Sequence, residues 1–346
     1  GWVLGGAIGT MPASLHMKRV GRQRGLATGT LWGIAGALIC AAAIWLQSFW
    51  LLCFGALVFG VYNAYGQYYR FAAADVASGD FKATAISLVL AGGLVGGILG
   101  PTTSRFTIGL LGPKLMGAYL VLIGFAVATM IVLRFIRMPT PGPAERSAAG
   151  RSLREIAMQP KYAVAVAAGA IGYGVMNFLM TSTPIAMQVC GHPYGDAAFV
   201  ISSHIIGMFA PSFVTGPVIK RIGALPVMFA GALLNFAAIG IALAGIAVAN
   251  FWWSLVILGV GWNFLYIGGT TLLTQTYRPE ERARAQGMNE QAIFTMMAIS
   301  SLTSGLTVTT AGWERVNLFA LPLVAAVAIA IVWFALRERA RKAAAA

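Results

Sequence analysis

The chain has 346 residues, of which 58% are apolar types and 10% are charged, and its formal net charge is +14. A soluble domain carries about 25% charged residues, so this composition excludes an ordinary cytosolic enzyme, a disordered chain and a coiled coil. The apolar runs are continuous over about 20 residues, the length of a membrane-spanning helix, whereas barrel strands alternate over about ten. We therefore expect an all-α, polytopic membrane protein.

Eleven apolar runs are long enough to cross a bilayer as helices, with bounds 1–15, 26–46, 49–71, 84–103, 114–136, 162–187, 198–219, 224–246, 250–276, 286–310 and 316–336. Lipid offers the backbone no hydrogen-bond partner, so each run should be helical. The polar, basic and proline-rich stretch 137–161 separates the fifth run from the sixth. We expect it to link an N-terminal half, 1–136, to a C-terminal half, 162–346.

The loops between these runs differ in positive charge. Of the 24 Lys and Arg residues, all but Arg105, Lys114 and Arg315 lie on one side of the expected membrane. Positive loops face the cytoplasm, which predicts a cytoplasmic linker and C-terminus in a multi-pass protein of a bacterial-type inner membrane. The spread of the charge argues against a nucleic-acid partner. Three cysteines without paired spacing predict no metal site and no disulfide framework.

The sequence repeats itself at a shift of 202 residues, which lays Lys18, Arg19 and Gly21 on Lys220, Arg221 and Gly223. The shift also lays Phe49 and Trp50 on Phe251 and Trp252. A parallel repeat of this kind is typical of a two-halved secondary transporter. The second half has six runs and the first half five, so we expect the chain to lack the first helix of its first half.

The loop after the first run resembles a signature of the major facilitator superfamily, Gly-x-x-x-Asp-Arg-x-Gly-Arg-Arg. The matching stretch runs from Ser14 to Arg24, and the second half repeats it from Gly216 to Gly223. Lysine replaces the family aspartate in both copies, at Lys18 and Lys220. The resemblance covers the whole chain. It implies two six-helix halves related by a pseudo-two-fold axis, about eleven of the helices being present here, and transport by alternating access.

Charged residues on the cytoplasmic loops, with the glycines that allow tight turns there, are the gating candidates. The set is Lys18, Arg19, Gly21, Arg22, Asp75, Asp80, Lys220, Arg221, Gly223, Glu280 and Glu281. In the first half we expect Arg19 or Arg22 to pair with Asp75 or Asp80. In the second half we expect Lys220 or Arg221 to lie near Glu280 or Glu281. Exposed pairs contribute only about 0–1 kcal/mol each, so their expected role is to bias inward-open against outward-open states.

Polar and aromatic side chains inside three runs are candidates for a solute cavity. Asn63, Gln67 and Arg70, for example, are spaced to share one helix face. The full set is Tyr62, Asn63, Tyr65, Gln67, Arg70, Tyr173, Asn177, Thr181, Trp262, Asn263, Tyr266 and Thr270. The aromatic residues favour an aromatic or amphipathic solute over a free sugar. The alternative is that these side chains form hydrogen bonds between packed helices.

Two ionisable residues within the runs, Glu290 and His204, are candidates for proton coupling. The alternatives are an ion pair of Glu290 with Arg284 or Lys82, and a hydrogen-bonded interior role for His204. The motif Gly96-x-x-x-Gly100-Pro101 resembles half of the antiporter signature of the family. Symport and antiport therefore both remain open.

These features predict a secondary transporter of a small organic solute, driven by protons, monomeric and without a cofactor. The competing hypotheses are a non-transporting protein of the same fold, such as a sensor or assembly partner, and a truncated, inactive transporter. An enzyme is not expected, because the three histidines lie in separate segments and no nucleophile and base group together.

Overall fold

The computed structural model of the chain describes residues 1–138, 142 and 150–345. Residues 139–141 and 143–149 of the expected linker lie outside the described residues. Throughout the described ranges every regular element is a helix, which confirms the all-α prediction. By length and composition, nine helical segments of the described residues can cross a membrane.

The described residues form two compact units. Unit 1 comprises Gly1–Val76, Val95–Leu153 and Tyr277–Phe294, and unit 2 comprises Ala77–Leu94, Arg154–Thr276 and Thr295–Ala346. Two long helices, α5 (Lys82–Thr107) and α14 (Arg282–Ala345), therefore contribute residues to both units. The halves 1–136 and 162–346 describe the sequence repeat, and that division stays a prediction.

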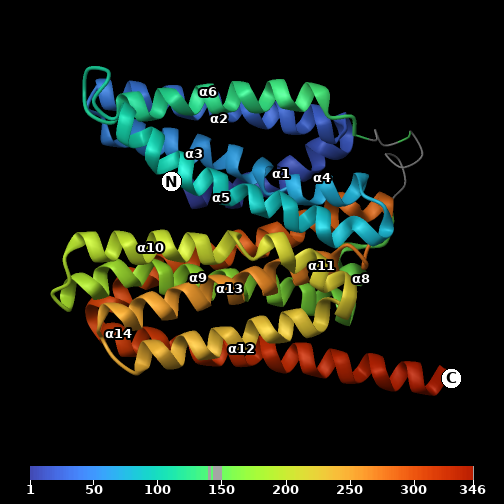
Figure 1. The fold of residues 1–346 in the computed structure, drawn as a ribbon. Helices are drawn as coiled ribbons and strands as arrows, with labels where there is room; N and C mark the ends of the chain where they lie inside the picture. Colours follow the sequence, from blue (N-terminus) through green and yellow to red (C-terminus); the bar gives the residue numbers. More distant parts are fainter. Residues whose placement is uncertain (139–141, 143–149, 346) are drawn as a thin grey trace. The chain divides into compact units, whose positions relative to one another are not determined.

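Unit 1 is built on helices that approach closely through glycine. Its helices besides parts of α5 and α14 are α1 (Trp2–Val20), α2 (Arg22–Trp45), α3 (Phe49–Gly66), α4 (Tyr69–Val76) and α6 (Met116–Phe135). α3 packs on α1 and α2, and α6 lies beside α2 (Figure 1). A Cβ atom on Gly5 would lie 1.9 Å from the carbonyl oxygen of Leu57, so only glycine permits this contact of α1 with α3.

Unit 2 is centred on α13 (Val248–Leu273), which packs against α9 (Pro160–Val189), α10 (Tyr194–Phe209) and α12 (Ala224–Leu243). α11 (Ser212–Ile222) continues α10, and the short α8 (Leu153–Ala157) precedes α9. Of the most apolar 18-residue stretch of α13, 78% is buried, the largest share for any candidate span among the described residues. A central helix of this kind can carry polar side chains, because neighbouring helices satisfy them.

Matching turns occur at the two copies of the repeat. Gly21 and Gly223 both have φ of 90°, a left-handed conformation that glycine adopts without strain. Each glycine ends one helix and begins the next, and each donates its N–H back to the preceding helix, to Met17 and Ile219 respectively. A short 3₁₀ helix, η1 (Gly79–Phe81) or η2 (Pro279–Glu281), precedes α5 and α14.

The expected runs are all helical, with three differences in continuity. Run 49–71 is divided between α3 and α4. Run 198–219 is divided between α10 and α11 at Pro211, whose missing N–H interrupts the hydrogen-bond ladder. The last two runs fall in α14, which Gly312 interrupts with φ of 81° and ψ of 172°.

Candidate functional site

A buried ion pair joins α4 to the beginning of α14 within unit 1. Arg70 Nη2 donates to Glu290 Oε1, and the two side chains are 3% and 0% exposed. Asn289 donates to the same carboxylate oxygen over 2.7 Å. The second oxygen, Glu290 Oε2, is buried without a hydrogen-bond partner among the described residues. Arg70, rather than the Arg284 or Lys82 considered from the sequence, is therefore the partner of Glu290.

Among the other candidates on α3 and the turn after it, Gln67 contacts this pair, and the rest have different surroundings. Arg70 Nη1 donates to the Gln67 backbone oxygen over 2.7 Å and to Gln67 Oε1 over 3.2 Å, so these two cavity candidates lie together. Asn63 Nδ2 is buried without a hydrogen-bond partner among the described residues. Tyr62 and Tyr65 instead lie against the glycines of α2, where added Cβ atoms at Gly33 and Gly29 would meet their rings. The structure thus gives these two tyrosines a packing role between α2 and α3.

An aromatic cluster lies at the centre of unit 2. Trp262 and Tyr266 of α13 stack with an interplanar angle of 17° and a centroid distance of 4.9 Å. Tyr173 of α9 meets both rings edge-on, at 5.3 and 5.5 Å, and Phe209 meets Trp262 edge-on at 5.9 Å. The indole Nε1 of Trp262 is buried and has no partner within the described part of the chain. A buried indole N–H normally finds an acceptor, so this donor is notable.

The two asparagine candidates of unit 2, Asn263 and Asn177, use their amides between helices. Asn263 is fully buried, and its Nδ2 donates over 2.7 Å both to Met208 O and to Ser212 Oγ. Its Oδ1 accepts from Thr215 over 2.8 Å. Asn177 Nδ2 donates to Ser300 and Ser301 of α14 over 2.8 and 2.9 Å. For these two residues the structure therefore shows hydrogen bonds between packed helices, the alternative to a solute cavity.

The remaining candidates of unit 2, Thr270, Thr181 and His204, differ in how deeply they are buried. Thr270 is buried on α13, and Thr181 is half-buried on α9. His204 is fully buried, and its Nδ1 lies 2.6 Å from the carbonyl oxygen of Leu255. Because a carbonyl only accepts, Nδ1 carries the hydrogen. In the described residues no carboxylate lies within ion-pair distance of His204, which matches the hydrogen-bonded interior alternative.

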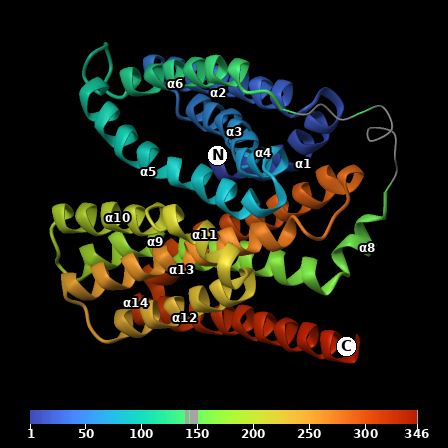
Figure 2. The same ribbon diagram turned by 45° about the vertical axis from the view of Figure 1, so that its right-hand side comes forward.

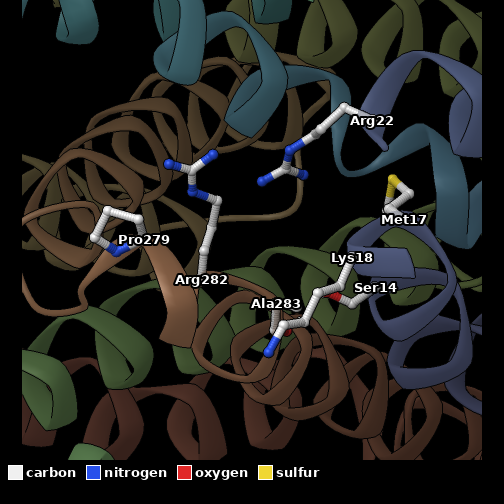
Figure 3. A pocket seen from close by; sticks show the side chains of 7 residues that line it. All are labelled: Ser14, Met17, Lys18, Arg22, Pro279, Arg282 and Ala283. Atoms are coloured by element: carbon white, nitrogen blue, oxygen red, sulfur yellow. The ribbon is translucent and has the colours of Figure 1, made fainter. Parts of the chain in front are cut away.

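A cationic cluster occupies the end of unit 1 where α1 meets α2. Asp75 Oδ2 accepts from Arg22 Nε over 2.8 Å and lies 3.3 Å from Arg282 Nη1. The pairing of Arg22 with Asp75 is one that the sequence predicts. Figure 3 shows the guanidinium groups of Arg22 and Arg282 turned toward each other. They line a cavity of about 30 Å³, enough for a water molecule, together with Ser14, Met17, Lys18, Pro279 and Ala283.

Hydrogen bonds tie this cluster to the start of α14. Ser14 donates to the Ala283 carbonyl over 2.7 Å, and Arg22 Nη2 donates to Gln286. Gln286 in turn donates over 2.6 Å to the phenol oxygen of Tyr277, which lies in the loop before η2. Burial, and next the negative charge of Asp75, raise the pKa of the Tyr277 phenol to about 12. Tyr277 therefore remains a neutral hydrogen-bonding group at physiological pH.

The second expected set of ion pairs joins residues of different units, Lys220 or Arg221 of unit 2 and Glu280 or Glu281 of unit 1, and stays a prediction. Glu281 accepts from Arg151 three times, from the backbone N, Nε and Nη2 over 2.8, 2.7 and 2.6 Å. Lys220 lies 3.9 Å from Asp80 in unit 2. Within unit 1, Glu281 thus binds the guanidinium group and the backbone N–H of Arg151 together, a bidentate charge-assisted contact that the ammonium of a lysine cannot form. Arg19, Arg221 and Glu280 form no ion pair within the described residues.

Sequence reasoning missed three members of these networks, Arg151, Arg282 and Gln286. Arg282 and Gln286 lie in the first turns of α14, directly after Glu281. Arg282 does not stand out there because further arginines share the stretch, and Gln286 carries no charge that would predict an ion pair. Arg151 lies in the expected linker. The available signal was the pair of acids at Glu280 and Glu281, which requires a cation without indicating which one.

Comparison with known proteins places this geometry in a family. The sequence pattern described as Major Facilitator Superfamily matches residues 1–288 and 167–346. The riboflavin transporter RfnT of Brucella anthropi is 40% identical over 95% of this chain and 83% of that protein. The uncharacterized MFS-type transporter YddS of Bacillus subtilis is 29% identical over 96% of this chain and 80% of that protein.

Solved structures of the family share the fold. The crystal structure of the MFS transporter FucP in the outward conformation superposes with a TM-score of 0.79 at 15% identity, over 96% of this chain and 87% of that chain. The human organic anion transporter MFSD10 superposes with a TM-score of 0.76 at 13% identity, over 95% and 82%. The chain therefore belongs to the Major Facilitator Superfamily: it is a multi-pass membrane transporter, not an enzyme.

Proposed function

We propose that this protein is a proton-coupled secondary transporter of riboflavin, or of a solute with the same kind of planar heteroaromatic ring. The observation that carries the proposal is the aromatic cluster of Tyr173, Trp262 and Tyr266 with its unpartnered indole N–H. The 40% identity to a riboflavin transporter of Brucella anthropi supports the same solute class. Alternating access of a central site is the transport mode of the fold.

The chemistry of a flavin ring suits this cluster. The ring is flat and aromatic, and its edge carries carbonyl oxygens and ring nitrogens that accept hydrogen bonds. Stacking on Trp262 or Tyr266 offers a large aromatic area, and offset or edge-on ring pairs contribute about 0.5–1.5 kcal/mol beyond burial. Trp262 Nε1 has a donor to spare and can fix the orientation of the ring edge. Thr181, half-buried on the same helix as Tyr173, is proposed to bind the polyol chain.

The ion pair of Arg70 with Glu290 is the proposed site of proton coupling. A proton arriving at Glu290 Oε2, the oxygen without a partner, converts the carboxylate to a neutral acid. Arg70 keeps its charge but loses its counter-charge, which is costly in a buried site. Proton binding therefore favours a conformation in which Arg70 finds another anion or water, and this preference couples the proton to the conformational cycle.

Uptake into proteoliposomes tests both parts of the proposal. Purified full-length chain is reconstituted, and entry of radiolabelled riboflavin is measured with and without an imposed proton gradient. We expect accumulation above equilibrium with the gradient and none after a protonophore is added. If the unmodified protein takes up no riboflavin, the proposal that riboflavin is the solute is wrong. If the uptake is the same with and without the proton gradient, the proposal of proton coupling is wrong.

A pair of tryptophan variants tests the site. Trp262→Phe keeps an aromatic ring and removes one donor, so KM for riboflavin should rise about tenfold. Trp252→Phe is the matched control, because Trp252 is on the same helix and its Nε1 is also buried without a partner among the described residues. Equal effects of the two variants would contradict the assignment of Trp262.

A further inference from the structure

A groove in unit 2 runs between the first turns of α12 and the last turns of α14. Its volume is about 370 Å³, and its floor is apolar, with Leu225, Phe229, Val332 and Leu336 among the lining residues. Figure 2 shows α12 beside the C-terminal part of α14, coloured red. Val332 is 40% and Leu336 is 58% exposed, so the floor is open to the surroundings.

The groove ends where α14 changes from apolar to basic. The helix carries no charged residue from Val316 to Leu336 and then carries Arg337, Arg339, Arg341 and Lys342, with a single acid, Glu338. Glu338 lies 3.7 Å from Lys161, and Arg337 lies over the ring of Trp333 at 5.4 Å. Arg339 and Lys342 line the groove, are exposed, and form no ion pair with any described residue. Two cations without an ion pair among the described residues thus lie at the end of the apolar groove, beside Glu338, whose charge is paired with Lys161.

We propose that this groove binds an anionic glycerophospholipid, with one acyl chain along the floor and the phosphate between Arg339 and Lys342. The apolar floor matches an acyl chain, and the two cations complement a headgroup of net negative charge. Basic residues directly after a membrane span attract anionic lipid at about 1 kcal/mol each. A zwitterionic headgroup has the same phosphate but adds a positive charge of its own, so it compensates the two cations less well. The bound lipid would tie the beginning of α12 to the end of α14.

Native mass spectrometry of the purified full chain with added phosphatidylglycerol or phosphatidylcholine of the same acyl chains tests this site. We expect one phosphatidylglycerol to be retained more strongly than phosphatidylcholine. The double variant Arg339→Gln with Lys342→Gln should lower phosphatidylglycerol affinity about thirtyfold. The control, Arg337→Gln with Arg341→Gln, removes the same charge from the same tail outside the groove and should lower it by only a few-fold.

A second variant tests the floor. Ala335→Phe fills the groove without changing charge, so it should reduce retention of both lipids. Equal loss in the two charge variants would overturn the site in favour of general attraction to the tail. Equal retention of the two lipids by the unmodified protein would overturn it as well. Both charge variants alter exposed side chains, so their folding is not at issue, and the readout does not depend on the transported solute.

Discussion

Removal of the Glu290 carboxylate should destabilise unit 1 more than the loss of any exposed ion pair. In Glu290→Leu, Arg70 remains charged at 3% exposure without its counter-ion. Breaking a buried pair from one side costs about 3–5 kcal/mol. Arg70 keeps its hydrogen bonds to Gln67 and its position 4.5 Å from the ring centre of Phe71. These contacts favour the lower end, about 3 kcal/mol.

Removal of both charges should cost less than removal of one. In the double variant Arg70→Met with Glu290→Leu, no buried charge is left unpaired, and apolar replacements of a buried pair are often neutral or stabilising. We therefore expect the double variant to recover most of the loss. Lys161→Gln is the control, because the pair of Lys161 with Glu338 spans 3.7 Å and is about one-third exposed on both sides. It should change stability by about 0–1 kcal/mol.

Denaturant unfolding of the detergent-solubilised protein, followed by tryptophan fluorescence, measures these free energies as a double-mutant cycle. The reasoning fails if the double variant is as unstable as the sum of the single ones. It also fails if Glu290→Leu is no worse than Lys161→Gln. Either result would mean that the buried pair contributes no more than a solvated one.

Two further predictions concern packing and the cationic cluster of unit 1. Gly5→Ala brings a Cβ atom to 1.9 Å from Leu57 O and should cost about 1–3 kcal/mol as α1 and α3 separate. The matched Gly66→Ala meets nothing within 4 Å and should leave unfolding unchanged or raise its free energy by up to about 1 kcal/mol. Asp75→Asn should lower the melting temperature more than Arg282→Gln, because the Arg282 side chain is 30% exposed and Arg22 loses its counter-charge at 10% exposure. Equal losses in the two variants would show that Arg282, rather than Arg22, is the main partner of Asp75.

The fold was readable from the sequence because membrane spans are local properties of the chain. A run of about 20 apolar residues must be helical in lipid wherever it lies. The turns at Gly21 and Gly223 were readable for a similar reason, since each lies between a basic helix end and the next apolar run. Both glycines have the same left-handed φ of 90°.

The partners within the bundle were not readable, because helical spacing gives a face but not the helix opposite to it. Arg70 and Glu290 are 220 residues apart, and no local pattern joins them. An amide inside an apolar run needs a polar neighbour, and both a solute cavity and an interhelical hydrogen bond supply one. Asn263 has three partners within unit 2, so the second case holds there.

The contact of α4 with the beginning of α14 depends on two ion pairs of opposite polarity. α4 supplies the cation Arg70 to Glu290 and the anion Asp75 to Arg282. If α4 shifted along α14 so that Arg70 approached Arg282, or Asp75 approached Glu290, like charges would repel each other. The two pairs therefore define one register of the contact. Neutralising Glu290 removes one pair, while Arg22 and Arg282 still share Asp75 at the other end. Under the proposed coupling, a proton on Glu290 would therefore loosen this contact at one end, while the pairs of Asp75 would still hold the other end.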